Sequence, residues 1–420
     1  MNENTDNLGR LRGRDCPVCG GNEIRAVLTL PDTPLGDRFT KTFEEALALK
    51  YYSLVVGRCD GCGHCFLPLE TPSDDSYLHY LFHSENSPGL LDSFREVVDD
   101  ISNRHNLGDG DLVLDIGAND GSWLEFFSEN GCDVIGVEPA PGPAKAAIDR
   151  GIPVVNDYFS PQSLLESGLL KGALRVVSMN YVFANLANPV STLEGITEIA
   201  GEKTVISVMT GYHPAQLEVS MFDYVYHEHL AYFSCRDFQI LAEKIGYTVT
   251  YAREIPLKGG SIHIEMQKSG PEVFESSIFQ TMLKREAWLD QPSDSQWTRI
   301  ADEIQKVGNL VRGEIGLVRS SGQKVIGFGA SHSTTTLLHA LGIASEPDLI
   351  IDDNPNKIGR YSPGSGIKVE PAQALRRHSG ATVLLLAWQH SYQILDSLRQ
   401  NGFRGTVIVP FPFFRSVEFS

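Results

Sequence analysis

Residues 111–140, DLVLDIGANDGSWLEFFSENGCDVIGVEPA, are the segment that most restricts how this 420-residue chain can fold. The apolar run 112–116 predicts a buried strand, the glycine-rich turn 117–121 follows it, and the apolar residues of 123–127 predict a helix. A second apolar strand then ends at Glu138. A strand, a crossover helix and a strand in this order predict a parallel sheet covered by helices, so we expect an α/β fold of the Rossmann type.

A second unit of the same kind begins at KVIGFGAS, residues 324–331, and three further strand-like segments follow it. Between the two units, apolar residues recur every three or four positions over 297–318, which predicts a helix with one buried face. A chain of this length is also too long for one compact core. We therefore expect an α/β multidomain protein, divided into an N-terminal module (1–75), a first Rossmann-like domain (76–270), connecting helices (271–320) and a second Rossmann-like domain (321–420).

The charge balance limits the possible partners. The chain has 35 Lys and Arg residues and 53 Asp and Glu residues, which gives a formal charge of -18. A protein with this excess of negative charge repels nucleic acid. The sequence has no apolar run of the roughly 18 residues that a membrane span needs. Its first residues are polar and lack the apolar core of a secretory signal. We expect a cytoplasmic protein that is a monomer or a weak oligomer and binds neither nucleic acid nor membrane.

Cysteines are concentrated near the N-terminus, with five of the seven in the first 65 residues. In a cytosolic chain this pattern favours metal binding over disulfides. Two C-x-x-C pairs, each on a turn that contains glycine, supply four thiolates for a structural zinc ion: Cys16, Cys19, Cys59 and Cys62. His64 and Cys65 are spare candidates for this site, and a set of reduced cysteines without metal is the alternative.

The first glycine-rich turn differs from a nicotinamide-binding turn. It lacks the G-x-G-x-x-G pattern, and Asp115, Asn119 and Asp120 would repel a pyrophosphate. An acidic turn instead suits a cationic nucleoside without phosphate, which indicates S-adenosylmethionine. Glu138, at the end of the second strand, is placed to accept both ribose hydroxyls.

The stretch YVYHEHL, residues 224–230, allows three interpretations: a metal site, an acid/base site, or a strand whose polar residues face water. His227 and His229 are two residues apart, unlike the i, i+4 pair of a helical zinc site. A histidine accepts a proton near neutral pH without a large pKa shift. Glu228 can orient a ring or bind a hydroxyl, and Tyr226 can donate a hydrogen bond to an oxyanion. On a straight strand these side chains alternate between faces, whereas a turn would let them converge.

The order of these motifs, together with KGGS (258–261), GFGAS and DDNPNKIGRYSPGSGI (352–367), resembles the zinc-containing S-adenosylmethionine-dependent C-3'-methyltransferases of nucleotide-deoxysugar biosynthesis. The resemblance covers nearly the whole chain. It implies a zinc module, a central class I methyltransferase domain and a C-terminal Rossmann-like domain that binds the substrate. It also implies the activity, which is transfer of a methyl group to C3 of a nucleotide-linked 4-keto deoxysugar through an enolate formed by a base.

The resemblance assigns roles by position. It makes His229 the base, with Tyr226 and Glu228 beside it. The cofactor-binding residues expected are Asp115, Gly117, Asn119, Asp120, Gly121, Glu138 and Asn180. The substrate-binding residues expected are Tyr80, Asn185, Lys258, Gly260, Ser261, Gly329, Ser331, Lys357 and Arg360.

The chain departs from the family at three of its motifs. Asn185 stands where the family usually has a histidine, Ser333 stands where it has a lysine, and Gln389 replaces an asparagine. Two other functions therefore stay open at this point. One is methylation of oxygen or nitrogen on another small metabolite, and the other is a non-catalytic zinc-ribbon binding protein.

Overall fold

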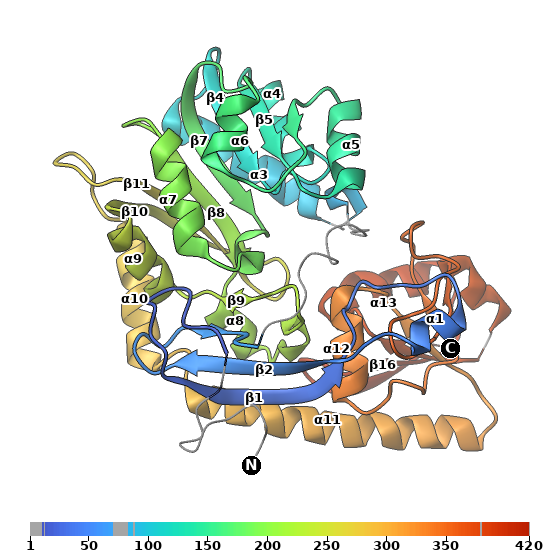
Figure 1. Ribbon diagram of the computed structural model, residues 1–420. Coiled ribbons are helices and arrows are strands. Elements are labelled where there is room, and N and C mark those ends of the chain that lie inside the picture. Colours follow the sequence, from blue (N-terminus) through green and yellow to red (C-terminus); the bar gives the residue numbers. More distant parts are fainter. Residues whose placement is uncertain (1–10, 12, 70–82, 87–88, 379, 420) are drawn as a thin grey trace.

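The computed structural model describes residues 11, 13–69, 83–86, 89–378 and 380–419. These residues form three sheets (Figure 1). The smallest has the order β1-β2-β3-β9 and belongs mainly to the N-terminal part of the chain. Its strands are β1 (Ile24–Thr33), β2 (Tyr52–Cys59), β3 (Cys65–Phe66) and β9 (Ala231–Tyr232). Because β9 comes from far along the sequence and pairs with β3, the N-terminal module is joined to the central domain through a shared sheet.

The central sheet has seven strands in the order β10-β11-β8-β7-β4-β5-β6. Its strands are β4 (Asp111–Ile116), β5 (Asp133–Val137), β6 (Val154–Val155), β7 (Ala173–Asn180), β8 (Val205–Gly211), β10 (Tyr247–Ile255) and β11 (Ser261–Lys268). The first five run parallel, while β11 is antiparallel to β8 and to β10. The accompanying helices are α3 (Leu90–His105), α4 (Ser122–Glu129), α5 (Pro141–Asp149), α6 (Pro161–Glu166), α7 (Pro189–Ile199), α8 (His213–Glu218) and α9 (Cys235–Lys244). The parallel strands are buried apolar runs, as a sheet covered on both faces requires.

The C-terminal sheet has the order β14-β13-β12-β15-β16-β17. Its strands are β12 (Val325–Phe328), β13 (Leu349–Ile351), β14 (Val369–Glu370), β15 (Thr382–Leu385), β16 (Gly405–Val409) and β17 (Arg415–Phe419). Only the β16–β17 pair among these described strands is antiparallel. Helices α12 (His332–Ala340) and α13 (Ser391–Gln400) belong to this domain. The sequence therefore correctly predicted two Rossmann-like sheets in a multidomain α/β chain.

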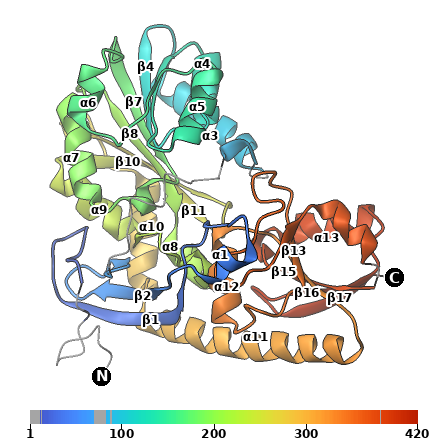
Figure 2. The ribbon, with the colours of Figure 1, turned by 45° about the vertical axis from the view of Figure 1, so that its right-hand side comes forward.

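Two helices connect the central and C-terminal sheets. α10 (Ser277–Leu289) ends before Pro292, and α11 (Asp294–Ser320) begins after Ser293, whose side chain accepts the N–H of Gln296 as an N-cap. The apolar face anticipated for this region is buried along α11: Trp297, Ile300, Ile304, Val307, Val311 and Ile315. Figures 1 and 2 show α11 running beneath β1 toward the C-terminal sheet. This one long helix therefore contacts both the N-terminal sheet and the C-terminal sheet.

The N-terminal module also contacts the C-terminal domain directly. β1 packs beside α12, and a β-bridge joins Thr40 to Tyr361. The hydroxyl of Tyr51 donates to the carbonyl of Gly364 at 3.2 Å. These contacts place β1, Thr40 and Tyr51 of the N-terminal module against the C-terminal domain. Among the described residues no helix is both long and apolar enough to cross a membrane.

Candidate active site

One cavity of about 940 Å³ extends from the carboxyl ends of β4, β5 and β7 to those of β12 and β13. The carboxyl ends of parallel strands are where open α/β sheets bind ligands, and here two such edges line the same space. Thirteen of the residues expected to act in catalysis or to bind cofactor or substrate line it: Asp115, Gly117, Asn119, Glu138, Asn180, Asn185, Tyr226, Glu228, His229, Lys258, Gly329, Ser331 and Lys357. Tyr80 lies outside the described residues.

Asp115 is the second-to-last residue of β4 and is almost completely buried. Its Oδ1 accepts the hydroxyl of Ser178 at 2.6 Å and the amide of Asn180 at 3.1 Å. Burial raises the pKa of this carboxyl to about 7, although both hydrogen bonds act to lower it. A bound cation would favour its charged form, so this end of the cavity suits a positively charged ligand.

Glu138 follows β5 and is buried beside the first glycine-rich turn. Its Oε2 accepts the N–H of Asn119 at 2.9 Å, and its Oε1 accepts the N–H of Ala140 at 2.7 Å. Burial also raises the pKa of Glu138. Among the described residues no Lys or Arg forms an ion pair with Glu138 or Asp115, so neither acid is neutralised by a fixed cation.

Asp120 and Gly121 belong to the same turn but do not line the cavity. The carboxylate of Asp120 accepts the hydroxyl of Ser122 at 2.6 Å and the N–H of Glu85 at 3.0 Å. Gly121 has a φ of 79°, and a Cβ there would lie 3.0 Å from the Cβ of Ala147. In this structure the two residues shape the turn and start α4, while Gly117 and Asn119 face the cavity.

The YVYHEHL stretch is a turn. The N–H of His229 donates to the carbonyl of Tyr226 at 2.9 Å, directly after the short helix η3 (Phe222–Tyr224). This turn brings the two side chains together, with the Tyr226 hydroxyl 2.6 Å from Nε2 of His229. The other ring nitrogen, Nδ1, lies 3.0 Å from the carbonyl oxygen of Tyr224.

These two contacts fix the protons of the pair. A carbonyl oxygen only accepts, so Nδ1 of His229 carries the hydrogen. Burial lowers the pKa of His229 to about 3, and the ring is therefore neutral near pH 7. Neutral Nε2 accepts, so the Tyr226 hydroxyl must be the donor. The phenol hydrogen that we expected to reach a substrate oxyanion is directed to His229 in this structure.

The other two polar residues of the stretch point to different places. His227 is buried, lies outside the cavity lining and packs against Tyr52 of β2, with ring centroids 5.8 Å apart. Glu228 lines the cavity, and its Oε2 has no hydrogen-bond partner among the described residues. Burial raises the pKa of Glu228 to about 7. The two histidines do not share a metal-ligand cluster among the described residues.

The C-terminal side of the cavity contains Gly329 and Ser331 from the second glycine-rich turn. Lys357 also lines it, but its ammonium contacts Oδ1 of Asp37 at 2.6 Å and the carbonyl of Ala330 at 2.8 Å. Arg360 lies outside the lining and donates to the carbonyl of Phe39 at 3.3 Å. Both cations therefore tie the N-terminal module to the C-terminal domain.

The KGGS turn meets the cavity through Lys258. Gly260 and Ser261 lie behind it and outside the lining. The Ser261 hydroxyl accepts from the phenol of Tyr181 at 3.1 Å and donates to the carbonyl of Leu257 at 3.0 Å. Of these three residues, Lys258 is the one that lines the cavity.

Sequence reasoning missed two histidines of the cavity, His332 and His390. The ring of His332 stacks on Tyr226 at a centroid distance of 5.4 Å, on the C-terminal side of the site. Burial lowers the pKa of His332 to about 4. Its place directly after the GFGAS turn was a usable signal, because residues that open a helix after such a turn face the ligand edge of a sheet.

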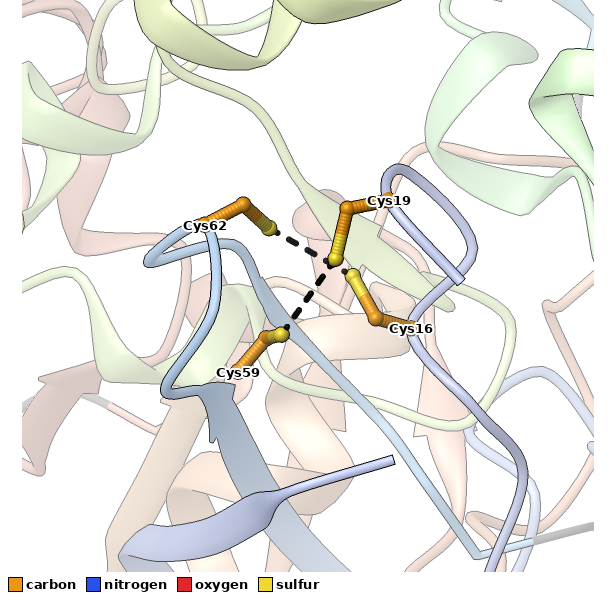
Figure 3. Close-up of side chains that lie close together, drawn as sticks. All are labelled: Cys16, Cys19, Cys59 and Cys62. Atoms are coloured by element: carbon orange, nitrogen blue, oxygen red, sulfur yellow. Dashed lines mark hydrogen bonds between the residues drawn. The ribbon is translucent and has the colours of Figure 1, made fainter. Parts of the chain in front are cut away.

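The four N-terminal cysteines form a compact cluster (Figure 3). Their sulfur atoms all lie within 4.8 Å of one another, with Cys16 and Cys62 3.6 Å apart and Cys19 and Cys59 3.5 Å apart. These separations exceed a disulfide bond and approach the roughly 3.8 Å between ligands of a tetrahedral zinc–thiolate site with bonds near 2.3 Å.

The spare zinc candidates lie outside this cluster. Nδ1 of His64 is 3.1 Å from a carboxylate oxygen of Asp237, and both side chains are buried. Cys65 is buried, with its thiol 3.8 Å from the carbonyl of Gly63. The residues present fit a metal site made of the four clustered thiolates alone.

Known proteins match both larger domains. Residues 79–252 match the family model described as a methyltransferase domain, and residues 256–412 match the one described as the C-methyltransferase C-terminal domain. The C-methyltransferase NovU of Streptomyces niveus is 28% identical over 408 residues, which cover 96% of this chain and 97% of that protein.

Two solved structures resemble part of the chain at 15% identity. Magnesium protoporphyrin IX methyltransferase of Synechocystis PCC 6803 covers 43% of this chain and 80% of its own, with a TM-score of 0.33. The match to a methyltransferase from Aquifex aeolicus covers 44% of this chain and 95% of that protein, with a TM-score of 0.31. With matches to a methyltransferase domain and to a C-methyltransferase C-terminal domain side by side, this chain is an S-adenosylmethionine-dependent methyltransferase, and it is similar to a C-methyltransferase over nearly its full length.

Proposed function

We propose that this enzyme methylates C3 of a nucleotide-linked 4-keto deoxysugar through an enolate. The observation that carries the proposal is one cavity that reaches the carboxyl ends of both Rossmann-like sheets, with the Tyr226–His229 pair lining it. A two-part substrate and a separate methyl donor need such a space, because the reacting carbon must lie between them. The match to a protein named C-methyltransferase supports carbon as the acceptor.

The residues at the central sheet fit S-adenosylmethionine. Asp115 and Glu138 are buried acids without a basic partner among the described residues, and they suit a cationic donor. Glu138 projects from the end of the second strand, where an acid can bind ribose hydroxyls. The bound cofactor supplies an electrophilic methyl group, which the cavity walls hold toward the acceptor.

The C-terminal edge supplies donors for an anionic nucleotide. Ser331 and Ser333 have their hydroxyls 2.9 Å apart at the start of α12, and both line the cavity. The N-terminus of a helix favours a phosphate group, because its first N–H groups and its dipole both point toward the ligand. We assign the nucleotide to this edge and the keto sugar to the space beside Tyr226.

We assign proton removal to the Tyr226–His229 pair. The C3 proton of the sugar passes to the phenol oxygen while the phenol proton moves to Nε2 of His229. The resulting imidazolium keeps its Nδ1 hydrogen bond to the carbonyl of Tyr224. Negative charge on the adjacent enolate favours this charged ring, which offsets the low pKa of His229 in the free protein.

The test is to supply a dTDP-4-keto-2,6-dideoxysugar with S-adenosylmethionine carrying a ¹³C methyl group. We expect NMR to show the label bonded to C3 of the sugar. In deuterated water without the cofactor, the C3 hydrogen should exchange. A label on oxygen or nitrogen, or no exchange, would contradict carbon methylation through an enolate.

We also propose that the four clustered cysteines hold a structural zinc ion. Four thiolates fill a tetrahedral site and leave no position for substrate. Elemental analysis should find one zinc per chain, and Cys62→Ser should lose it and lower the melting temperature. Cys132→Ser is the matched control, because Cys132 is equally buried but lies outside the cluster. All seven cysteines are unpaired as thiols, which suits a reducing cytoplasm.

A further inference from the structure

We propose that Asp223 and Trp388 are positioning residues for proton removal, because their buried hydrogen bond attaches the catalytic turn, residues 222–229, to the C-terminal domain. This inference rests on the proposed function and adds to it the part that the C-terminal domain plays in the chemistry. Neither side chain lines the cavity, so both must act through the residues that do.

The hydrogen bond joins two domains. Asp223 is the middle residue of η3 and has no exposed surface, and Trp388 begins η5 (Trp388–His390), which follows β15. The indole N–H of Trp388 donates to Oδ2 of Asp223 at 2.9 Å. Trp388 is only 3% exposed, so water does not compete for this bond. A hydrogen bond in such surroundings is strong, and leaving either group unpaired is costly.

Two further contacts attach the catalytic turn to the C-terminal domain. The carbonyl of Val225 accepts the hydroxyl of Thr336, a buried residue of α12, at 2.9 Å. Phe222 packs against Phe411 with ring centroids 5.2 Å apart. The residues on both sides of Tyr224 therefore contact the C-terminal domain, which limits how far the carbonyl of Tyr224 can move.

Tyr224 connects these contacts to the chemistry. Its carbonyl accepts the Nδ1 hydrogen of His229 at 3.0 Å, and this bond leaves Nε2 as the acceptor for the Tyr226 hydroxyl at 2.6 Å. Because Asp223 and Val225 flank Tyr224, movement of either residue displaces that carbonyl. The ring of His229 then loses the contact that selects its tautomer, and the phenol loses its acceptor.

Asp223 also lies beside the start of α12, where we assign the nucleotide. The helix η3 contacts α12. Burial raises the pKa of Asp223 to about 7, although hydrogen bonding from Trp388 and from Ser333 acts to lower it. Ser333 lines the cavity. Binding of a nucleotide at α12 therefore acts on the same acid that holds the catalytic turn.

A hydrogen bond with a structural role alone predicts a different response from a positioning role. Its removal would lower the melting temperature and weaken ligand binding, without a specific effect on proton transfer. Loss of a positioning bond should leave ligand binding intact and slow removal of the C3 proton, since a small displacement of reacting groups can cost about 100-fold in rate.

The test compares Trp388→Phe, which removes the N–H donor and keeps a buried ring, with Asp223→Leu, which removes the acceptor. We expect each change to slow C3 exchange in deuterated water and kcat by about 10- to 100-fold. Asp223→Asn keeps an acceptor oxygen for the indole and should recover part of the loss. Affinities for S-adenosylmethionine and dTDP, measured by calorimetry, should stay close to those of the wild type. Trp297→Phe is the matched control, because this tryptophan of α11 is similarly buried and packs against His213.

A double variant tests whether the two residues act as one unit. Trp388→Phe combined with Asp223→Leu should slow exchange no more than the more harmful single change does, because one hydrogen bond can be lost only once. Losses that multiply would show that the two side chains act independently.

Three results would overturn the assignment: wild-type exchange and kcat in both single variants, multiplied losses in the double variant, or weaker ligand binding with kcat unchanged. If Asp223→Leu does not fold, Trp388→Phe decides, with calorimetric cofactor binding as the check on folding. Absence of C3 exchange in the wild-type enzyme would instead refute the enolate of the proposed function, while the kcat values of the variants would still decide the role of this pair.

Discussion

The central and C-terminal sheets end in the same hydrogen-bonding arrangement, but the groups around it differ. Glu138 accepts the N–H of Asn119 from one glycine-rich turn and the N–H two residues beyond itself. Asp352 accepts the N–H of Ala330 at 2.6 Å and the N–H of Asn354 at 2.8 Å in the same pattern. Each acid thus joins the turn after one strand to the end of the next strand.

Glu138 and Asp352 differ in the charged and polar groups that surround them. The central acid lies near the buried carboxyl of Asp115, without a fixed cation among the described residues. The C-terminal acid lies in a wall that also contains Lys357, His332 and two serine hydroxyls. The comparison teaches that the backbone pattern is generic to the fold, while the groups beyond it differ: a second buried acid at the central edge, and hydroxyls with an ion-paired lysine at the C-terminal edge.

The largest expected effect lies between the two edges, at His229. We predict that His229→Gln lowers turnover by at least about 1,000-fold, because both proton transfer and the partner of Tyr226 are lost. Affinities for S-adenosylmethionine and dTDP should stay within a few-fold, measured by calorimetry. His227→Gln is the control, since that ring faces Tyr52 and not the cavity. Normal turnover in the His229 variant would remove this residue from proton transfer.

A reciprocal pair of variants tests the comparison directly. Glu138→Gln should weaken S-adenosylmethionine binding by about 1–3 kcal/mol and leave dTDP binding unchanged, because one accepted N–H loses its partner. Asp352→Asn should do the reverse. Calorimetric titration of each variant with both ligands gives four values, and equal losses for both ligands would show that the edges are not separate sites.

A pH series sharpens the contrast at the central edge. The pKa of Asp115 is raised to about 7 by burial, so this carboxyl is neutral well below pH 7 and charged above it. A cationic ligand favours the charged form, and its binding should therefore release a proton. We predict that affinity for S-adenosylmethionine rises as pH increases from 6 to 8, by at most about tenfold per pH unit below the pKa. Asp115→Asn should flatten this dependence, and an equal slope in that variant would assign it to another group.

The smallest expected effect concerns the hydroxyls at α12. Ser331→Ala should reduce dTDP affinity only a few-fold, because backbone N–H groups remain as donors and the lost hydrogen bond contributes about 0.5–1.5 kcal/mol. Affinity for S-adenosylmethionine in the same variant is the internal control. A loss confined to the cofactor would contradict the assignment of α12 to the nucleotide.

Much of the architecture could be predicted because it depends on local sequence. Apolar strands, glycine-rich turns and the buried face of α11 follow from periodicity and backbone conformation, which neighbouring residues determine. The limit of such reasoning is visible in the N-terminal sheet, where β9 completes a sheet that begins some two hundred residues earlier. Pairing over such a distance depends on tertiary packing and leaves no periodic signal.

The site shows the same division residue by residue. Sequence reasoning selected Tyr226, Glu228 and His229, but Lys357 and Arg360 also looked like ligands for an anionic substrate. The structure gives both cations partners in the loop that contains Asp37 and Phe39. It also adds His332, which no motif singled out. A basic residue after a strand is a candidate ligand until the packing shows which acceptor it meets.

The sequence by itself determined the chemical types available to this protein: paired thiols, buried acids at a glycine-rich turn, and an imidazole beside a phenol. It could do so because residue type sets what a group can donate, accept or coordinate. Only the tertiary structure decided which proton each group holds, since the Tyr224 carbonyl fixes the His229 tautomer and thereby the direction of the Tyr226 hydroxyl. Hydrogen-bond direction depends on angles and distances between folded segments, and these are set when the three sheets pack around one cavity.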